Sequence, residues 1–191
     1  DDIKAEDTLA ACVKHFAGYG GAEAGRDYNT VELSEHTLEE YYMPAYKAAI
    51  DAGAAMVMTS FNTIDGIPTT VNKRLMRDIL RDQMGFKGVL ISDFAAIREA
   101  VMHGVCADHR ESAEMALKAG CDIDMMAGDY SRHLSELIDE GIVGEELLDE
   151  SVMRILKLKN DLGLFENPFK GLDLVKEKEL CLCDEHKELA K

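Results

Sequence analysis

The sequence has too few basic residues to balance its acidic ones. Lysine and arginine number 21 against 37 aspartates and glutamates, so the formal net charge at pH 7 is −16. A chain of this charge repels phosphate backbones and anionic membrane surfaces, which argues against nucleic-acid binding and against docking on a membrane. No apolar run approaches the ~18 residues that a membrane-spanning helix needs.

Cysteine is scarce and odd in number. Five cysteines match no disulfide framework. Cys12, Cys106 and Cys121 lie in or beside apolar stretches and are predicted to be small buried thiols. Cys181 and Cys183 have one residue between them and lack the spacing of a zinc site, so neither a metal nor a cofactor is expected.

The N-terminal residues 1–7 lack the basic and apolar regions of a signal peptide. If the chain is part of a longer one, this absence carries no information about export. The cysteine usage favours a reducing compartment. The location therefore stays open between the cytoplasm and an exported state.

Short apolar runs alternate with amphipathic segments, a pattern typical of βα units on a parallel sheet. With 191 residues, 47% hydrophobic and 30% charged, the chain is long enough to bury a core. The predicted strands lie at 9–16, 54–60, 88–92 and 121–126. The predicted helices lie at 34–52, 72–84, 108–119, 129–140 and 145–162. Ser34 and Asp129 are predicted helix caps.

Four βα units fit two architectures. A full (β/α)₈ barrel needs eight strands and about 250 residues, whereas a four-stranded sheet could form a small doubly wound domain. No Gly-x-Gly-x-x-Gly or Walker motif follows a strand, so nucleotide binding has little support. We therefore predict an α/β fold that is the second half of a TIM barrel, with parallel strands and outer helices. Residues 1–163 are predicted to form this half barrel and residues 164–191 a linker or tail.

Polar residues stand at the predicted carboxyl ends of the strands, where parallel α/β folds place their active sites. Asp93 follows an apolar strand and could meet a ligand, although it could equally cap the next helix. Lys14 and His15 could donate hydrogen bonds to neighbouring hydroxyls, although a solvated lysine and a core histidine explain them as well.

Other polar and apolar side chains at these ends are also open to two interpretations. Asp122 and Asp124 could form an acid/base pair, but support of the fold is favoured for Asp122. Met58 and Phe61 could form an apolar platform, although core packing is commoner for such residues. Four further histidines show no ligand spacing and are predicted to be surface residues: His103, His109, His133 and His186.

Several motifs occur in the order seen in glycoside hydrolase family 3. They are Lys-His-Phe-Ala-Gly-Tyr-Gly at 14–20, Gly-Arg-Asp-Tyr-Asn at 25–29, Met-Thr-Ser-Phe-Asn at 58–62 and Ser-Asp-Phe at 92–94. The chain resembles the bacterial β-glucosidases of periplasmic type in this family over residues 9–170. The order of the motifs makes the resemblance more specific than any one of them.

The resemblance implies a retaining, exo-acting enzyme that removes terminal β-glucosyl residues from oligosaccharides or glucosides. It implies that Asp93 is the nucleophile and that Lys14 and His15 hold the hydroxyls of the sugar. Met58 and Phe61 match positions that line the sugar subsite, although many relatives have tyrosine in place of Phe61. Arg26 matches a residue that is expected to support the Lys-His loop.

The resemblance also implies parts that residues 1–191 do not contain. Retaining hydrolysis needs a second carboxyl group, which in relatives comes from a following α/β sandwich domain. The first half of the barrel supplies further sugar ligands. The isolated chain is therefore expected to be inactive and to associate with itself through open sheet edges.

The resemblance leaves other functions open. A β-xylosidase or glucan exohydrolase of the same family, and a sugar-binding half barrel without catalysis, are the alternatives. An aminosugar substrate is disfavoured because the loop at 21–25 lacks an Asp-Ser-His motif. The relatives that the chain resembles are periplasmic or secreted, and the location of this chain stays open between export and the cytoplasm.

Overall fold

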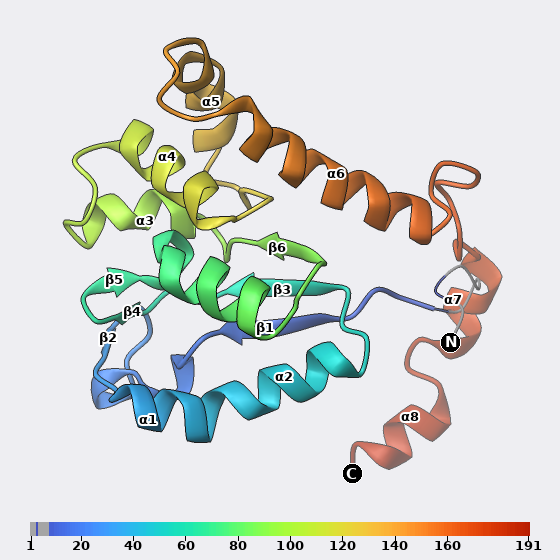
Figure 1. Ribbon diagram of the computed structural model, residues 1–191. Helices are drawn as coiled ribbons and strands as arrows, with labels where there is room; N and C mark the ends of the chain where they lie inside the picture. The colour runs from blue at the N-terminus through green and yellow to red at the C-terminus, as the bar shows by residue number, and fades with distance from the viewer. Residues whose placement is uncertain (1–2, 4–7) are drawn as a thin grey trace. The chain divides into compact units, whose positions relative to one another are not determined.

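The computed structural model describes Ile3 and residues 8–191 (Figure 1). The prediction that residues 1–7 are not a signal peptide concerns, apart from Ile3, residues outside this description. The chain divides into two compact units, one of residues 10–158 and one that joins the described N-terminal residues to residues 159–191. In the described part of the chain, no helix has the length and apolar character needed to cross a membrane.

The larger unit alternates strands and helices along the chain. Its strands are β1 Cys12–Phe16, β2 Thr30–Val31, β3 Met56–Thr59, β4 Thr63–Ile64, β5 Ile67–Pro68 and β6 Val89–Ile91. Its short helical turns are η1 Tyr19–Gly21, η2 Glu23–Gly25 and η4 Thr69–Val71, and its π-helices are η3 Leu38–Tyr42 and η5 Arg74–Gln83. Its α-helices are α1 Glu35–Thr37, α2 Met43–Asp51, α3 Ala96–Met102, α4 His109–Ala119, α5 Asp129–Asp139 and α6 Glu145–Asp161, of which α6 continues into the smaller unit.

The main sheet is parallel, with the strand order β1-β3-β6. Met56 pairs with Cys12 on one side and with Val89 on the other. The backbone at Gly88 lies very close to that of Ala55. A Cβ added at Gly88 would be 2.2 Å from the carbonyl oxygen of Ala55. Only glycine allows the Val89 N–H to reach that carbonyl, at 3.1 Å.

The fourth predicted strand, 121–126, is reduced to a single parallel bridge between Ile91 and Ile123. The Ser92 N–H still donates to the Ile123 carbonyl at 2.9 Å, so the segment lies at the edge of the sheet. The pairing stops early because the chain turns at Met126, whose φ is 71°.

A second small sheet has the order β2-β4-β5. No strand of this sheet was predicted on either side of Asp65 and Gly66. These residues instead form a tight hairpin turn between β4 and β5, with φ of 53° and 74°. A two-residue turn of this kind needs positive φ at both positions, which aspartate and glycine tolerate.

The five predicted helices are present close to their predicted positions, whereas α3 and the two helices within residues 164–191 were not predicted. The predicted helix 34–52 is one helical run through α1, η3 and α2, in which Ser34 caps the start by accepting the Thr37 N–H at 3.1 Å. Pro44 interrupts the hydrogen-bond ladder because it has no N–H, and the π-helix η3 ends two residues before it. The predicted helices 72–84, 108–119 and 145–162 correspond to η5, α4 and α6.

The predicted cap of α5 is wrong. Asp129 is the first residue of the helix, and the preceding Gly128 makes no side-chain cap. The carboxylate of Asp124 accepts the N–H groups of Asp129 and Tyr130 instead, at 2.7 and 3.2 Å. A carboxylate from before the turn can reach the free N–H groups of a first helical turn as well as a residue at the cap itself.

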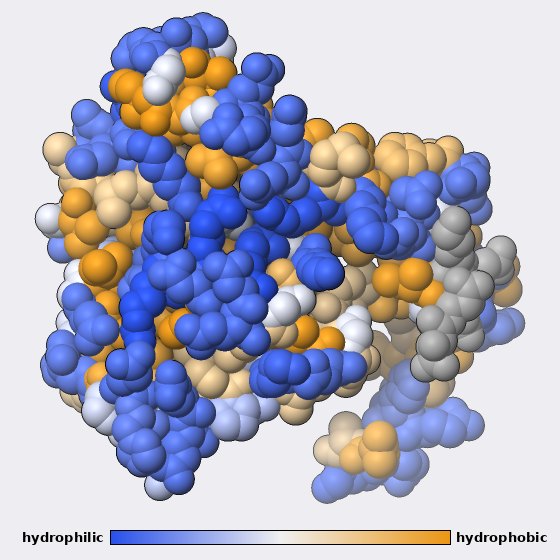
Figure 2. Space-filling view, in the orientation of Figure 1, coloured by the Kyte–Doolittle hydropathy of each residue, from blue (hydrophilic) through white to orange (hydrophobic). Residues whose placement is uncertain are grey.

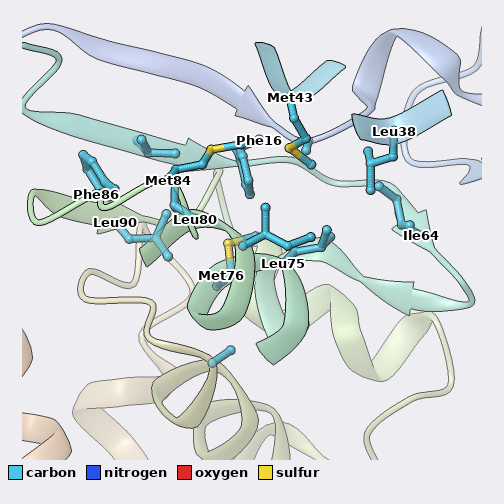
Figure 3. Close-up of a cluster of buried hydrophobic side chains, with 14 of the residues drawn as sticks. Phe16, Leu38, Met43, Ile64, Leu75, Met76, Leu80, Met84, Phe86 and Leu90 are labelled. Atoms are coloured by element: carbon cyan, nitrogen blue, oxygen red, sulfur yellow. The ribbon is translucent and has the colours of Figure 1, made fainter. Parts of the chain in front are cut away.

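The main core lies between the sheet and its covering helices (Figure 3). It combines side chains from β1, α2, η5 and β6, among them Phe16, Met43, Leu80 and Leu90, all less than a tenth exposed. Each such side chain contributes ~1.5–3 kcal/mol on burial. The core therefore fixes the strand ends on which the site is built.

The surface reflects the acidic composition. Figure 2 shows hydrophilic side chains over η5, whose opposite face buries Leu75, Met76, Ile79 and Leu80. Of the predicted buried thiols, Cys106 and Cys121 are buried, whereas Cys12 is half-buried.

In the smaller unit, residues 164–191 contain two helices, α7 Leu174–Leu180 and α8 Asp184–Leu189. Asp173 caps α7 by accepting the N–H groups of Val175 and Lys176 at 2.9 and 3.1 Å. Cys181 is exposed and Cys183 is half-buried. The domain boundary at residue 163 stays a prediction.

Candidate active site

The candidate site lies at the carboxyl ends of β1, β3 and β6, where the chain passes into β2, β4, β5 and α3 (Figure 1). Parallel strands bring their carboxyl ends to one edge of the sheet. His15 in β1 and Asp93 after β6 meet there, with Nε2 of His15 3.3 Å from Oδ2 of Asp93.

Asp93 is held by two hydrogen bonds, and neither of them involves its second carboxylate oxygen. Its residue is 7% exposed, its N–H donates to Oγ1 of Thr59 at 3.2 Å, and its Oδ1 accepts the Phe94 N–H at 2.7 Å. Among the described residues, no hydrogen bond reaches its buried Oδ2. A buried carboxylate oxygen with a free lone pair can act as a nucleophile.

The alternative role of Asp93 as a helix cap is not what the structure has. The helix α3 starts after Ala95, which has a φ of 57° and gives no side-chain cap. The Asp93 side chain accepts from its neighbour Phe94 rather than from the first turn of α3.

A pair of hydroxyls lies behind Asp93. Oγ1 of Thr59 is 2.7 Å from Oγ1 of Thr70, and both threonines are at most 1% exposed. The Thr70 hydroxyl can fill the remaining hydrogen-bonding capacity of Thr59 while Thr59 accepts the Asp93 N–H. Sequence analysis missed this pair, because buried threonines after a strand carry no pattern of their own.

The surroundings of His15 favour its neutral form. Burial lowers its pKa, the Asp93 carboxylate works in the opposite direction, and the Lys14 ammonium lowers it further. A neutral imidazole has one N–H donor and one acceptor, which suits a hydroxyl group. The Tyr46 hydroxyl donates to the His15 carbonyl and fixes the backbone.

Lys14 is exposed beside His15, in a stretch where the peptide bonds Lys14–His15 and Phe16–Ala17 are cis. Arg26 is also exposed, at the end of the turn η2, where its N–H donates to the Glu23 carbonyl at 3.2 Å. The roles predicted for Lys14 and Arg26 stay predictions.

Three aromatic rings line the site. The ring centroid of Tyr19 lies 5.2 Å from that of His15 and 6.1 Å from that of Phe61, both in edge-on geometry. The centroids of Tyr28 and Phe61 are 4.4 Å apart. The Tyr19 hydroxyl donates to Asp27, and burial together with that carboxylate raises the Tyr19 pKa. Phe61 therefore belongs to an aromatic wall rather than to the core between sheet and helices.

Met58 is half-buried on β3 and pairs in register with Ile91. Because side chains alternate along a strand, Met58 faces away from the core that holds Val57. Met58 therefore lies on the face of the sheet opposite the main core. The interpretation of Met58 as ordinary core is thereby disfavoured.

Asp122 and Asp124 do not form an acid/base pair. Asp122 is fully engaged by Nη2 of Arg81 at 2.8 Å, Nη1 of Arg154 at 2.7 Å and the Leu90 N–H at 2.8 Å. The structural role favoured for Asp122 is confirmed. The Asp124 carboxylate instead accepts hydrogen bonds from the N–H groups at the start of α5.

His103 is not the surface residue that sequence analysis predicted. It is half-buried and its imidazole hydrogen-bonds to the backbone of Phe61. Burial lowers its pKa more than this hydrogen bond raises it. Among the described residues, no group of three or more His, Cys, Asp and Glu side chains could hold a metal ion.

The fold and the comparisons place the chain among the α/β-barrel glycoside hydrolases, which confirms the predicted α/β half-barrel class. Residues 3–158 match the family described as "Glycosyl hydrolase family 3 N terminal domain". The chain belongs to glycosyl hydrolase family 3.

Individual relatives agree with this assignment. A periplasmic beta-glucosidase from Salmonella typhimurium is 45% identical over 165 residues, which are 86% of this chain and 22% of that protein. A putative beta-xylosidase from Formosa agariphila is 38% identical, over 88% of this chain and 23% of that protein. The crystal structure of a beta-glucosidase from Listeria innocua in complex with glucose has a TM-score of 0.93 at 52% identity, over 100% of this chain and 26% of that chain. The chain thus spans about a quarter of the length of these relatives.

Proposed function

We propose that the chain supplies the nucleophile and part of the sugar subsite of a retaining, exo-acting β-glucosidase. The observation that carries the proposal is the free, buried Oδ2 of Asp93 beside His15. The names of the relatives, beta-glucosidases and beta-xylosidases, support the same reaction class.

In this mechanism Oδ2 of Asp93 attacks the anomeric carbon of a terminal β-glucosyl residue. A second carboxylic acid protonates the departing oxygen, and a glycosyl ester forms with inversion. A water molecule, deprotonated by the same second carboxylate, then attacks the anomeric carbon and releases Asp93. The two inversions give net retention.

The neighbouring side chains hold the sugar. Lys14 and the neutral His15 donate to its hydroxyls, while Met58 and Phe61 line the subsite. Arg26 supports the Lys14–His15 loop. The Thr59 hydroxyl fixes the backbone of Asp93, so that the nucleophile needs little reorganisation.

The second carboxyl group and the rest of the subsite lie outside residues 1–191. We propose that residues 1–163 belong to the half barrel, that residues 164–191 lead toward an α/β sandwich domain, and that a first half barrel completes the sheet. The strand β1 is an edge of the described sheet, with β3 as its one neighbour. Isolated chains should therefore pair through β1, and size-exclusion chromatography with light scattering should find dimers or larger species. A stable monomer would contradict this part of the proposal.

The nucleophile can be tested without the acid. A 2,4-dinitrophenyl 2-deoxy-2-fluoro-β-glucoside has a leaving group that needs little protonation, and its fluorine slows release of the glycosyl ester. We use the term natural chain for the full protein that contains residues 1–191 together with the proposed further parts. We expect mass spectrometry of this natural chain to find one fluoroglucosyl group on the peptide that contains Asp93. The variant Asp93→Ala should take up none, and the control Asp139→Asn, at an exposed position, should label as the wild type does. A label on another residue would overturn the assignment.

A β-xylosidase is the second candidate, because relatives of 38% and 34% identity carry that name. The two sugars differ in the hydroxymethyl group at C5. Rates of hydrolysis of nitrophenyl β-glucoside and β-xyloside by the natural chain distinguish the two candidates. The isolated residues 1–191 should hydrolyse neither at a useful rate.

A further inference from the structure

A groove of about 230 Å³ lies next to the aromatic wall and plays no part in the mechanism above. It is lined by Tyr28 from the loop before β2 and by Glu99, Met102 and His103 from the end of α3. These three positions on α3 are spaced three and four residues apart, so they share one face of the helix.

The groove is continuous with the candidate active site. The Tyr28 ring lies 4.4 Å from the Phe61 ring, and His103 hydrogen-bonds to the Phe61 backbone. Burial raises the pKa of both Glu99 and Tyr28, and the negative charge of Asp93 raises it further, so the groove lies within the field of the nucleophile. A group that leaves from a sugar bound at Asp93 can therefore enter the groove directly.

The walls of the groove suit a flat, weakly polar group. Tyr28 presents an aromatic face, and Met102 presents a thioether that is 85% exposed. Both an aryl ring and the C–H face of a pyranose pack on such a surface. Tyr28 has a φ of 65°, in the left-handed region that bulky residues rarely adopt, and such conformations concentrate at sites that clamp ligands.

The charge of the groove has one sign. Glu99 is the carboxylate in its wall. Burial raises the pKa of Tyr28, and the negative charges of Glu99, Asp27 and Asp93 raise it further. His103 compensates little, because burial lowers its pKa and so favours the uncharged imidazole. An anion in the groove would thus meet repulsion without a partner.

We propose that this groove binds the leaving group of the substrate and that Glu99 excludes leaving groups that carry a negative charge. The inference rests on the proposed glucosidase function and adds its substrate class, namely β-glucosides of neutral aryl or sugar aglycones.

The test compares two aryl β-glucosides that differ in little but charge, a 4-carboxyphenyl glucoside and its methyl ester. The natural chain should have a lower kcat/KM for the acid than for the ester. In Glu99→Gln the ratio of kcat/KM for the acid to kcat/KM for the ester should rise about tenfold. This is the size expected for one partly screened charge a few ångströms away. The ratio between variants cancels the intrinsic difference between the two leaving groups.

Controls separate the inference from the proposal beneath it. The variant Glu136→Gln, at an exposed position on α5, should keep the wild-type ratio. The affinity for glucose, which has no aglycone, should not change in Glu99→Gln, and Met102→Ala should weaken binding of phenyl β-thioglucoside but not of methyl β-thioglucoside.

Hydrolysis of both glucosides with an unchanged ratio in Glu99→Gln would overturn the role of Glu99 alone. Equal effects of Met102→Ala on both thioglucosides would overturn the groove as the aglycone site. Failure of the natural chain to bind glucose or to hydrolyse either glucoside would overturn the proposed function itself, and the inference with it.

Discussion

Replacement of Asp122 by alanine should destabilise the larger unit more than any surface substitution. The side chain of Asp122 is completely buried, and it accepts from Arg81, Arg154 and the Leu90 N–H at 2.7–2.8 Å. The two arginine side chains are 8% and 17% exposed, so water reaches them poorly once the carboxylate is gone. Removal of one partner from such a buried ion pair costs about 3–5 kcal/mol.

In a chain of this length, each kcal/mol shifts the midpoint of thermal unfolding by about 2–4 °C, so a decrease of about 6–20 °C is expected. Circular dichroism during thermal and urea unfolding of the 191-residue chain would measure it. The control Asp139→Asn should stay within about 0.5 kcal/mol of the wild type. A double-mutant cycle with Asp122→Asn and Arg154→Met isolates the pair itself. A loss of less than about 1 kcal/mol in Asp122→Ala would refute the view that this carboxylate ties the sheet to α6.

Three further predictions concern the site and the thiols. Thr70→Val should lower kcat of the natural chain about tenfold with little change in KM, the effect of one lost hydrogen bond, and Thr70→Ser should restore it; equal losses in both variants would argue for packing instead. The His15 imidazole should titrate below 6.5 in NMR spectra, and Asp93→Asn should lower that midpoint further because the carboxylate raises the pKa. Since folding lowers this pKa, the associated stability should be complete above about pH 6.5 and decline as the pH falls. Iodoacetamide should modify the exposed Cys181 of the native chain well before Cys106, whose pKa burial raises to about 11; equal rates would show that Cys106 is accessible.

The regular elements were predictable because each depends on neighbours in the sequence. Apolar runs produced β1, β3 and β6 close to their predicted positions. Ser34 could be identified as a helix cap, since its hydroxyl reaches an N–H only three residues away. Asp124 was not identified as the cap of α5, because its contact depends on the path of the turn between Asp124 and Asp129.

The small sheet β2-β4-β5 and the helix α3 were missed for a related reason. Two-residue strands are too short to carry an alternating pattern, and they exist because β2 and β4 are brought together across 32 residues. The helix α3 starts after Ala95 at positive φ, without any capping side chain that a sequence pattern could indicate.

For the site, the sequence by itself named the candidates: the order of motifs indicated Asp93, Lys14 and His15, and the apolar runs predicted that they lie at strand ends. Only the tertiary structure decided which oxygen of Asp93 has no hydrogen bond and that burial lowers the pKa of His15. It also turned His103 from a presumed surface residue into a wall of the groove. The physical reason is that hydrogen-bond satisfaction and burial depend on segments far apart in the chain, which a reading of local pattern does not see.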